Sequence, residues 1–196
     1  MLERAAPQAY PVRQRPMRIL PYLSMPAEFR AYDPQVVEVA HRLVGAIRRV
    51  EPKLRVEHVG STSVPGCGGK GIIDLAVLYP AGFLAGARAI LDRLGFQKQG
   101  GPDPFPESRP MRVGCVEHDG RRFLIHAHII LLDSDEHREL VFFRGALRAS
   151  SRLRHCYEER KRAILAMGIR DPIAYCKAKG AFITDVLKAM QTGGAF

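Results

Sequence analysis

Residues 71–80, GIIDLAVLYP, form an almost unbroken apolar run that carries a single charge, Asp74. Such a run is typical of a strand that is buried on both faces of its sheet. A chain that contains it must cover the sheet from both sides with other elements. The 196 residues correspond to one domain of ordinary size. We therefore expect a single α/β domain of the α+β kind.

Hydrophobic periodicity predicts the elements around this strand. Helices are predicted from Asp33-Pro34 to about Pro52 and over 81–94, 135–148, 151–166 and 172–190. Asp33-Pro34 and Asp171-Pro172 each combine an N-cap aspartate with proline at the first helical position. Strands are predicted at 54–60 and on both sides of Asp119-Gly120, a pair typical of a type I′ hairpin. A hairpin beside a buried strand predicts a mixed sheet.

The chain divides into an arm, a sheet core and a helical extension. Residues 1–16 carry three prolines and four charges without an apolar period, so we expect a flexible N-terminal arm. Residues 17–196 are expected to form the domain, with its sheet core at about 54–132 and a helical C-terminal extension at about 134–190. Four prolines in 99–110 predict a long loop between these strands.

The formal net charge of +10 favours anionic partners such as nucleotides, phosphates or nucleic acid. A basic surface that only confers solubility is the alternative. The cysteines Cys67, Cys115, Cys156 and Cys176 lack the spacing of a zinc site, which is typical of reduced thiols. No apolar run approaches the roughly 20 residues of a membrane span, and the first residues lack the apolar centre of a signal peptide. We expect a cytoplasmic protein without a membrane partner.

The segment 57–77, EHVGSTSVPGCGGKGIIDLAV, contains the residues most suited to a site. Its glycines and hydroxyls offer donors to phosphate oxygens, and Lys70 adds positive charge. Thirteen residues after Ser61 stands Asp74, whose charge is costly to bury unless it is paired or bound to a metal. The alternative is a turn whose hydroxyls cap its own backbone, with Asp74 at the solvated end of the sheet.

His126 and His128 stand two residues apart in a predicted strand, so their side chains share one face. Asp74 and His58 would share that face if their strands are neighbours. Two imidazoles and a carboxylate suit a divalent transition metal, whereas Mg²⁺ prefers oxygen ligands. The alternative is that both histidines are structural or face a phosphate.

The segment 57–77 resembles the GrpB family, whose members carry the pattern EHxGSTSVPGxxxKPxxD. The likeness continues at His126-Ala127-His128, at FFRGALR (142–148) and at Tyr175 to Ile183. This family is grouped with the polymerase-beta-like nucleotidyltransferase superfamily, so the resemblance implies that fold. The same module also occurs fused behind dephospho-CoA kinase. This chain contains no GxxxxGK[ST] loop, so we expect no kinase activity.

The resemblance implies a site for a nucleotide or another phosphorylated ligand, with Asp74 coordinating Mg²⁺. Asp74, His126 and His128 would form the catalytic group. The residues expected to bind ligand or phosphate are His58, Gly60, Ser61, Thr62, Ser63, Lys70, Arg144 and Lys179.

The superfamily's two-metal chemistry requires more than one carboxylate, but Ala76 stands two positions after Asp74. Nucleotidyl transfer is therefore one hypothesis for this chain. The other is a non-catalytic nucleotide-binding or scaffold module that supports a protein of coenzyme A synthesis. The chain shows neither zinc-finger spacing nor the aromatic-basic interleaving of single-strand binders, so sequence-specific nucleic-acid binding is not expected.

Overall fold

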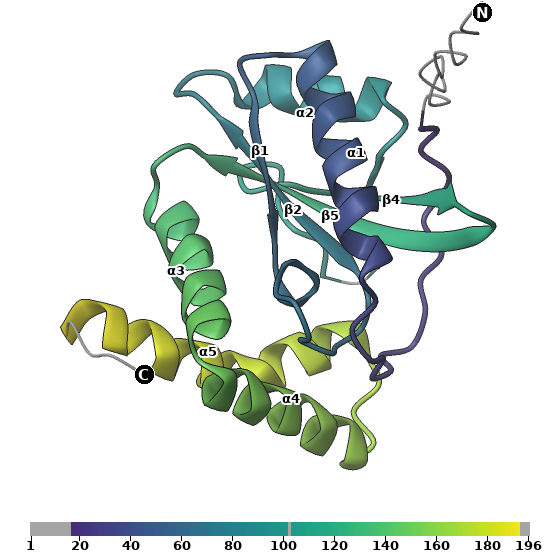
Figure 1. Ribbon diagram of the computed structural model, residues 1–196. Helices are drawn as coiled ribbons and strands as arrows, with labels where there is room; N and C mark the ends of the chain where they lie inside the picture. The colour runs from purple at the N-terminus through teal and green to yellow at the C-terminus, as the bar shows by residue number, and fades with distance from the viewer. Residues whose placement is uncertain (1–16, 102, 193–196) are drawn as a thin grey trace, which may run out of the picture.

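The computed structural model describes residues 17–101 and 103–192 (Figure 1). The expected arm at 1–16 lies outside the described residues. The sheet is mixed and five-stranded, in the order β1-β2-β5-β4-β3. Its strands are β1 (Arg55–Val59), β2 (Ile73–Tyr79), β3 (Gln97–Lys98), β4 (Met111–His118) and β5 (Arg121–Leu131). β2 runs parallel to β5 and the other neighbours are antiparallel, which confirms the mixed sheet.

The sheet has helices on both faces, as the apolar run of β2 requires. α1 (Gln35–Val50) and α2 (Leu84–Arg93) pack on one face, where Leu75 and Ile125 are fully buried. On the opposite face Ala76 and Ile130 pack against Leu140 of α3 (Asp135–Ala149). α4 (Ser151–Ala166) and α5 (Pro172–Thr192) extend from α3 beside that face (Figure 1). None of the described helices combines the length and apolarity needed to cross a bilayer.

Local sequence signals explain where several elements begin and end. Asp119 and Gly120 both have positive φ, at 49° and 72°, as a type I′ turn requires between β4 and β5. Asp171 caps α5, because its Oδ1 accepts the backbone N–H of Ala174 at 2.8 Å. The helix predicted from Asp33-Pro34 begins at Gln35, whose N–H is bound by Oδ1 of Asp33 at 3.0 Å.

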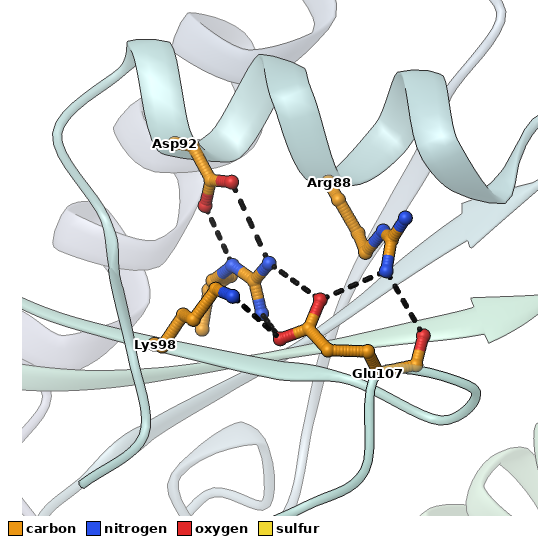
Figure 2. A network of polar contacts seen from close by, with 5 residues as sticks. Arg88, Asp92, Lys98 and Glu107 are labelled. Carbon is orange, nitrogen blue, oxygen red and sulfur yellow. Dashed lines mark hydrogen bonds and ion pairs between the residues drawn. The ribbon is translucent and has the colours of Figure 1, made fainter.

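The described part of the predicted loop at 99–110 contains no helix or strand, and it is anchored near its end by a charge network (Figure 2). Glu107 lies between two arginines, with Oε2 3.1 Å from Nη2 of Arg112 and 2.9 Å from Nη1 of Arg88. Arg112 also donates from Nε to Oδ1 of Asp92 at 2.6 Å. The loop is thereby tied to α2 and β4.

Candidate functional site

The parallel pairing of β2 with β5 brings Asp74 together with His126 and His128. In this register Asp74 lies opposite His126, and Ala76 lies opposite His128. Oδ1 of Asp74 is 3.6 Å from Nδ1 of His126 and 3.5 Å from Nε2 of His128. One donor atom of each side chain lies within 4.8 Å of the other two. All three are partly buried on the face opposite α1 and α2. This is the arrangement of a candidate metal centre.

The protonation states in this cluster suit a metal. Burial alone would raise the pKa of Asp74, but hydrogen bonds with His126 and His128 outweigh it and hold that pKa well below its usual range. Burial first, together with the charges of His128 and Lys70, lowers the pKa of His126 against the attraction of Asp74. At neutral pH the carboxylate is ionised and the His126 ring is neutral, and these are the forms that ligate a metal.

The glycine-rich turn meets this cluster at Gly60. Gly60 has a φ of +69°, and a Cβ at this position would collide with Oδ2 of Asp74. The neighbouring Ser61 begins a short 3₁₀ helix (Ser61–Ser63) and lines the pocket in front of Asp74. The serine-bearing turn and the aspartate thirteen residues later therefore converge in space, although the intervening chain is a loop.

The other two hydroxyls of the turn serve its own fold. Oγ1 of Thr62 donates to the carbonyl of Ile72 at 3.0 Å and is 3.0 Å from Nε2 of His58. Oγ of Ser63 donates to the carbonyl of Gly60 at 2.7 Å. Both residues are buried, and neither lines the pocket. The structure thus places Ser61, but not Thr62 or Ser63, on the wall of the pocket.

His58 lies on the other face of the sheet from Asp74. It pairs with Leu75, whose side chain belongs to the core under α1 and α2, whereas Asp74 pairs with Val59. Neighbouring strands were therefore not sufficient to bring His58 to the cluster, because an antiparallel register sets which residues share a face. His58 instead supports the turn through Thr62.

This position of His58 makes stability depend on pH. Burial first, and then Arg148 and Arg144, lower its pKa to about 4 against the attraction of Asp74. The folded state therefore disfavours the charged ring. The stabilising contribution is complete above pH 6.5 and is lost as the pH falls towards 4, by about 2 kcal/mol between pH 7.5 and 5. Urea unfolding of the wild type and His58→Gln at both pH values measures this loss. An equal pH dependence in the two proteins would contradict it.

Arg144 is also outside the pocket. Its Nη2 is 3.0 Å from Oε2 of Glu57 and its Nη1 donates to the carbonyl of His58 at 2.7 Å. Arg148, one turn later, donates to the carbonyl of Ser63 at 2.6 Å. These two arginines tie α3 to β1 and to the turn. The structure therefore places Arg144 in contacts between α3 and β1 and not in the lining of the pocket.

A pocket of about 600 Å³ opens in front of the cluster, between the sheet, α3, α5 and the loop after β3. Lys70 and Lys179 both line it, with Nζ atoms 5.4 and 5.7 Å from the ring centroid of Tyr175. The surroundings of Lys179, Tyr157 foremost, raise its pKa, so it is a cation at neutral pH. Phe105 adds a second aromatic ring to the lining. The pocket lining therefore combines lysine ammonium groups with aromatic rings.

Sequence reasoning missed two residues, one that the fold brings to the Asp74 cluster and one that it brings to the pocket. The hydroxyl of Tyr22 is 2.9 Å from Nε2 of His126, across 104 positions of sequence, and no local pattern indicated it. Lys161 is buried at the pocket floor, where Nζ donates to the carbonyl of Gly68 and lies 3.5 Å from Sγ of Cys67. Lys161 stands in a run of charged residues, and only the packing of α4 shows that its side chain is buried.

A family model described as GrpB protein matches residues 26–189. The UPF0157 protein BH1888 of Halalkalibacterium halodurans is 29% identical over 160 residues, which cover 80% of this chain and 78% of that protein. The crystal structure of the conserved protein GrpB from Enterococcus faecalis has 27% identity and a TM-score of 0.64. That match covers 82% of this chain and 95% of the other.

A more distant likeness concerns the fold. The structure of the GLD-2/RNP-8 complex matches with a TM-score of 0.51 and 15% identity, over 84% of this chain and 62% of the other. This likeness confirms the polymerase-beta-like nucleotidyltransferase fold that the sequence resemblance implied. At this identity it is informative about the arrangement of helices and strands alone.

Proposed function

The chain belongs to the GrpB protein family, and we propose that it binds a divalent transition metal together with the phosphate groups of a nucleotide. The observation that carries this proposal is the convergence of Asp74, His126 and His128 within 4.8 Å, in front of the turn at Ser61. The metal would be held by these three side chains. The phosphates would contact the metal, Ser61 and the two pocket lysines.

The donor set decides the class of metal. Two imidazole nitrogens and one carboxylate oxygen suit ions such as Zn²⁺, Mn²⁺, Co²⁺ or Fe²⁺ better than Mg²⁺. The two-magnesium arrangement of nucleotidyl transfer does not fit, because Ala76 is fully buried in an apolar cluster where a second carboxylate would be required. We therefore propose binding and derive no transfer step. When bound, the metal would supply Lewis-acid neutralisation of phosphate charge.

The lysines and the aromatic rings support a nucleotide over a bare anion. Among the described residues, no carboxylate forms an ion pair with Lys70 or Lys179, so both ammonium groups are available to phosphate oxygens. Phe105, which is only partly buried, offers flat apolar surface to a base in the same pocket. The pocket of about 600 Å³ is of the size that holds small-molecule ligands.

Titration calorimetry tests this function with ATP, CTP and inorganic triphosphate, each with and without Zn²⁺ or Mn²⁺. We expect nucleotide binding that strengthens with the metal. Lys70→Ala and Lys179→Ala should each weaken it by about 10-fold, because each removes a charged hydrogen-bond donor. The matched control is Lys98→Ala, since this exposed lysine pairs with Glu107 outside the pocket. Absence of binding at millimolar nucleotide would contradict the proposal and favour a scaffold role.

A further inference from the structure

The segment before α1 is held along the edge of the sheet. Leu20 and Cys115 exchange two backbone hydrogen bonds, of 2.7 and 3.0 Å, in an isolated antiparallel bridge to β4. Ile19 packs so closely on Gly114 that a Cβ there would collide with it. The backbone N–H of Tyr22 then donates to Oε1 of Gln97 at 3.0 Å. The backbone of this segment is thus fixed by β4 and β3, immediately before the Tyr22 side chain enters the site.

The Tyr22 side chain reaches the outer nitrogen of a candidate metal ligand. Its hydroxyl is 2.9 Å from Nε2 of His126, and the two ring centroids are 5.6 Å apart. The inner nitrogen, Nδ1, is the one that faces Asp74 at 3.6 Å. The phenol hydroxyl is both a donor and an acceptor, so it can either donate a hydrogen bond to Nε2 or accept one from Nε2–H.

The two histidines differ in this respect. Nε2 of His128 is the atom that faces Asp74, and within the described chain no hydrogen bond holds the Nδ1 of His128. His128 contacts Phe105 by an edge-on ring contact of 5.9 Å instead. Among the described residues, His126 therefore has a polar partner on the nitrogen that faces away from Asp74, and His128 does not.

We propose that Tyr22 is the positioning residue of the metal centre, an inference that rests on the proposed function. A neutral imidazole carries its proton on one nitrogen and offers the other as a ligand. With the metal bound between His126 and Asp74, the Tyr22 hydroxyl would accept a hydrogen bond from Nε2–H, hold the proton on that nitrogen and leave the lone pair of Nδ1 to the metal. The segment at residues 19–22 becomes part of the metal centre through this bond.

The affinity for Zn²⁺, measured by competition with a chelator, tests this inference on the whole chain. Tyr22→Phe keeps the ring and removes only the hydroxyl, and we expect a loss of about 10- to 100-fold, as is usual for the outer hydrogen bond of a histidine ligand. Gln97→Ala leaves the hydroxyl intact but frees the backbone of Tyr22, so a smaller loss is expected. Tyr32→Phe, whose ring packs on the core under α1, is the matched control and should bind as the wild type does.

A second readout separates positioning from stability. Long-range ¹H–¹⁵N spectra of the imidazole rings show which nitrogen carries the proton, and His126→Gln identifies the signals of that residue. In the Zn²⁺-loaded wild type we expect a proton on Nε2 of His126 that exchanges slowly with water, and faster exchange in Tyr22→Phe. Urea unfolding of the same samples reports any change of stability separately.

The outcomes distinguish this inference from the proposed function. Equal Zn²⁺ affinity and equal Nε2–H exchange in the wild type and Tyr22→Phe would overturn the positioning role and leave the metal site standing. A wild-type protein that binds no Zn²⁺, Mn²⁺ or Co²⁺ would overturn the metal site and, with it, the role of Tyr22. Weakened binding together with faster exchange, in a variant as stable as the wild type, supports the proposal.

Discussion

Asp74→Asn is expected to lower the affinity for Zn²⁺ by more than about 100-fold. The substitution keeps the size of the side chain but removes the negative charge that balances the cation, and it replaces the one anionic ligand of the three. Because loss of an outer hydrogen bond costs about 10- to 100-fold in metal affinity, loss of a ligand charge should cost more. Gly60 lies so close to Asp74 that a side chain at position 60 would collide with it. The turn therefore cannot supply a carboxylate at that position in place of Asp74.

Chelator competition or the absorption spectrum of the Co²⁺ form measures this loss. Asp103→Asn is the matched control, because Asp103 lines the same pocket but pairs with Lys177 at 3.6 Å, outside the Asp74 cluster. Its Zn²⁺ affinity should stay within about twofold of the wild type, because screened surface charges act weakly. Comparable losses in the two variants would mean that a diffuse negative field, and not Asp74, attracts the ion.

The charge network around Arg112 predicts the largest effect on stability (Figure 2). The Arg112 side chain is only 2% exposed, while its partners Asp92 and Glu107 are 45% and 41% exposed. Asp92→Asn with Glu107→Gln leaves a buried guanidinium without a counter-charge and should lower the free energy of unfolding by about 3–5 kcal/mol. Arg112→Met leaves two carboxylates that reach water, so we expect a loss of only about 1–2 kcal/mol.

Urea unfolding at pH 7.5 measures both changes. The order of the two losses is the informative result. We expect the greater loss from the double variant, although Asp92 and Glu107 are far more exposed than Arg112. Glu117→Gln is a matched control, since its pair with Arg122 is more than half exposed on both sides and should change stability by less than about 1 kcal/mol. If Arg112→Met proves the more damaging change, packing of its side chain and not its charge holds the loop after β3.

The pattern of the turn and of β2 was sufficient to predict part of the site. Glycines and hydroxyls before a buried strand with one charge indicated that Ser61 and Asp74 share a pocket, and the structure brings them together at Gly60. The spacing of His126 and His128 placed both side chains on one face. These inferences depend on local geometry, because strand alternation and turn composition act over a few residues.

The positions of other predicted site residues depend on long-range packing, and for these residues the sequence did not predict the position. The side of the sheet on which His58 lies is set by the pairing of β1 with β2. In this register His58 lies opposite Leu75 and not opposite Asp74. Arg144 was placed by its charge, but the partner that binds it is Glu57 on another strand. Helical spacing shows which side chains share a face, but not what covers that face.

The sequence by itself determined the helices, the strands, the type I′ turn and the family, because these follow from backbone preferences and from a long local motif. Only the tertiary structure decided that Asp74 of β2 and the two histidines of β5 come together as a candidate metal centre. Those strands are neighbours because the chain crosses between them through α2, β3 and β4, and the parallel register then sets His128 beside Ala76. The two histidines therefore reach Asp74 from the neighbouring strand, whereas a second carboxylate two positions later would have stood on the strand of Asp74 itself. No local pattern encodes that register, since it results from the burial of both faces of the sheet at once.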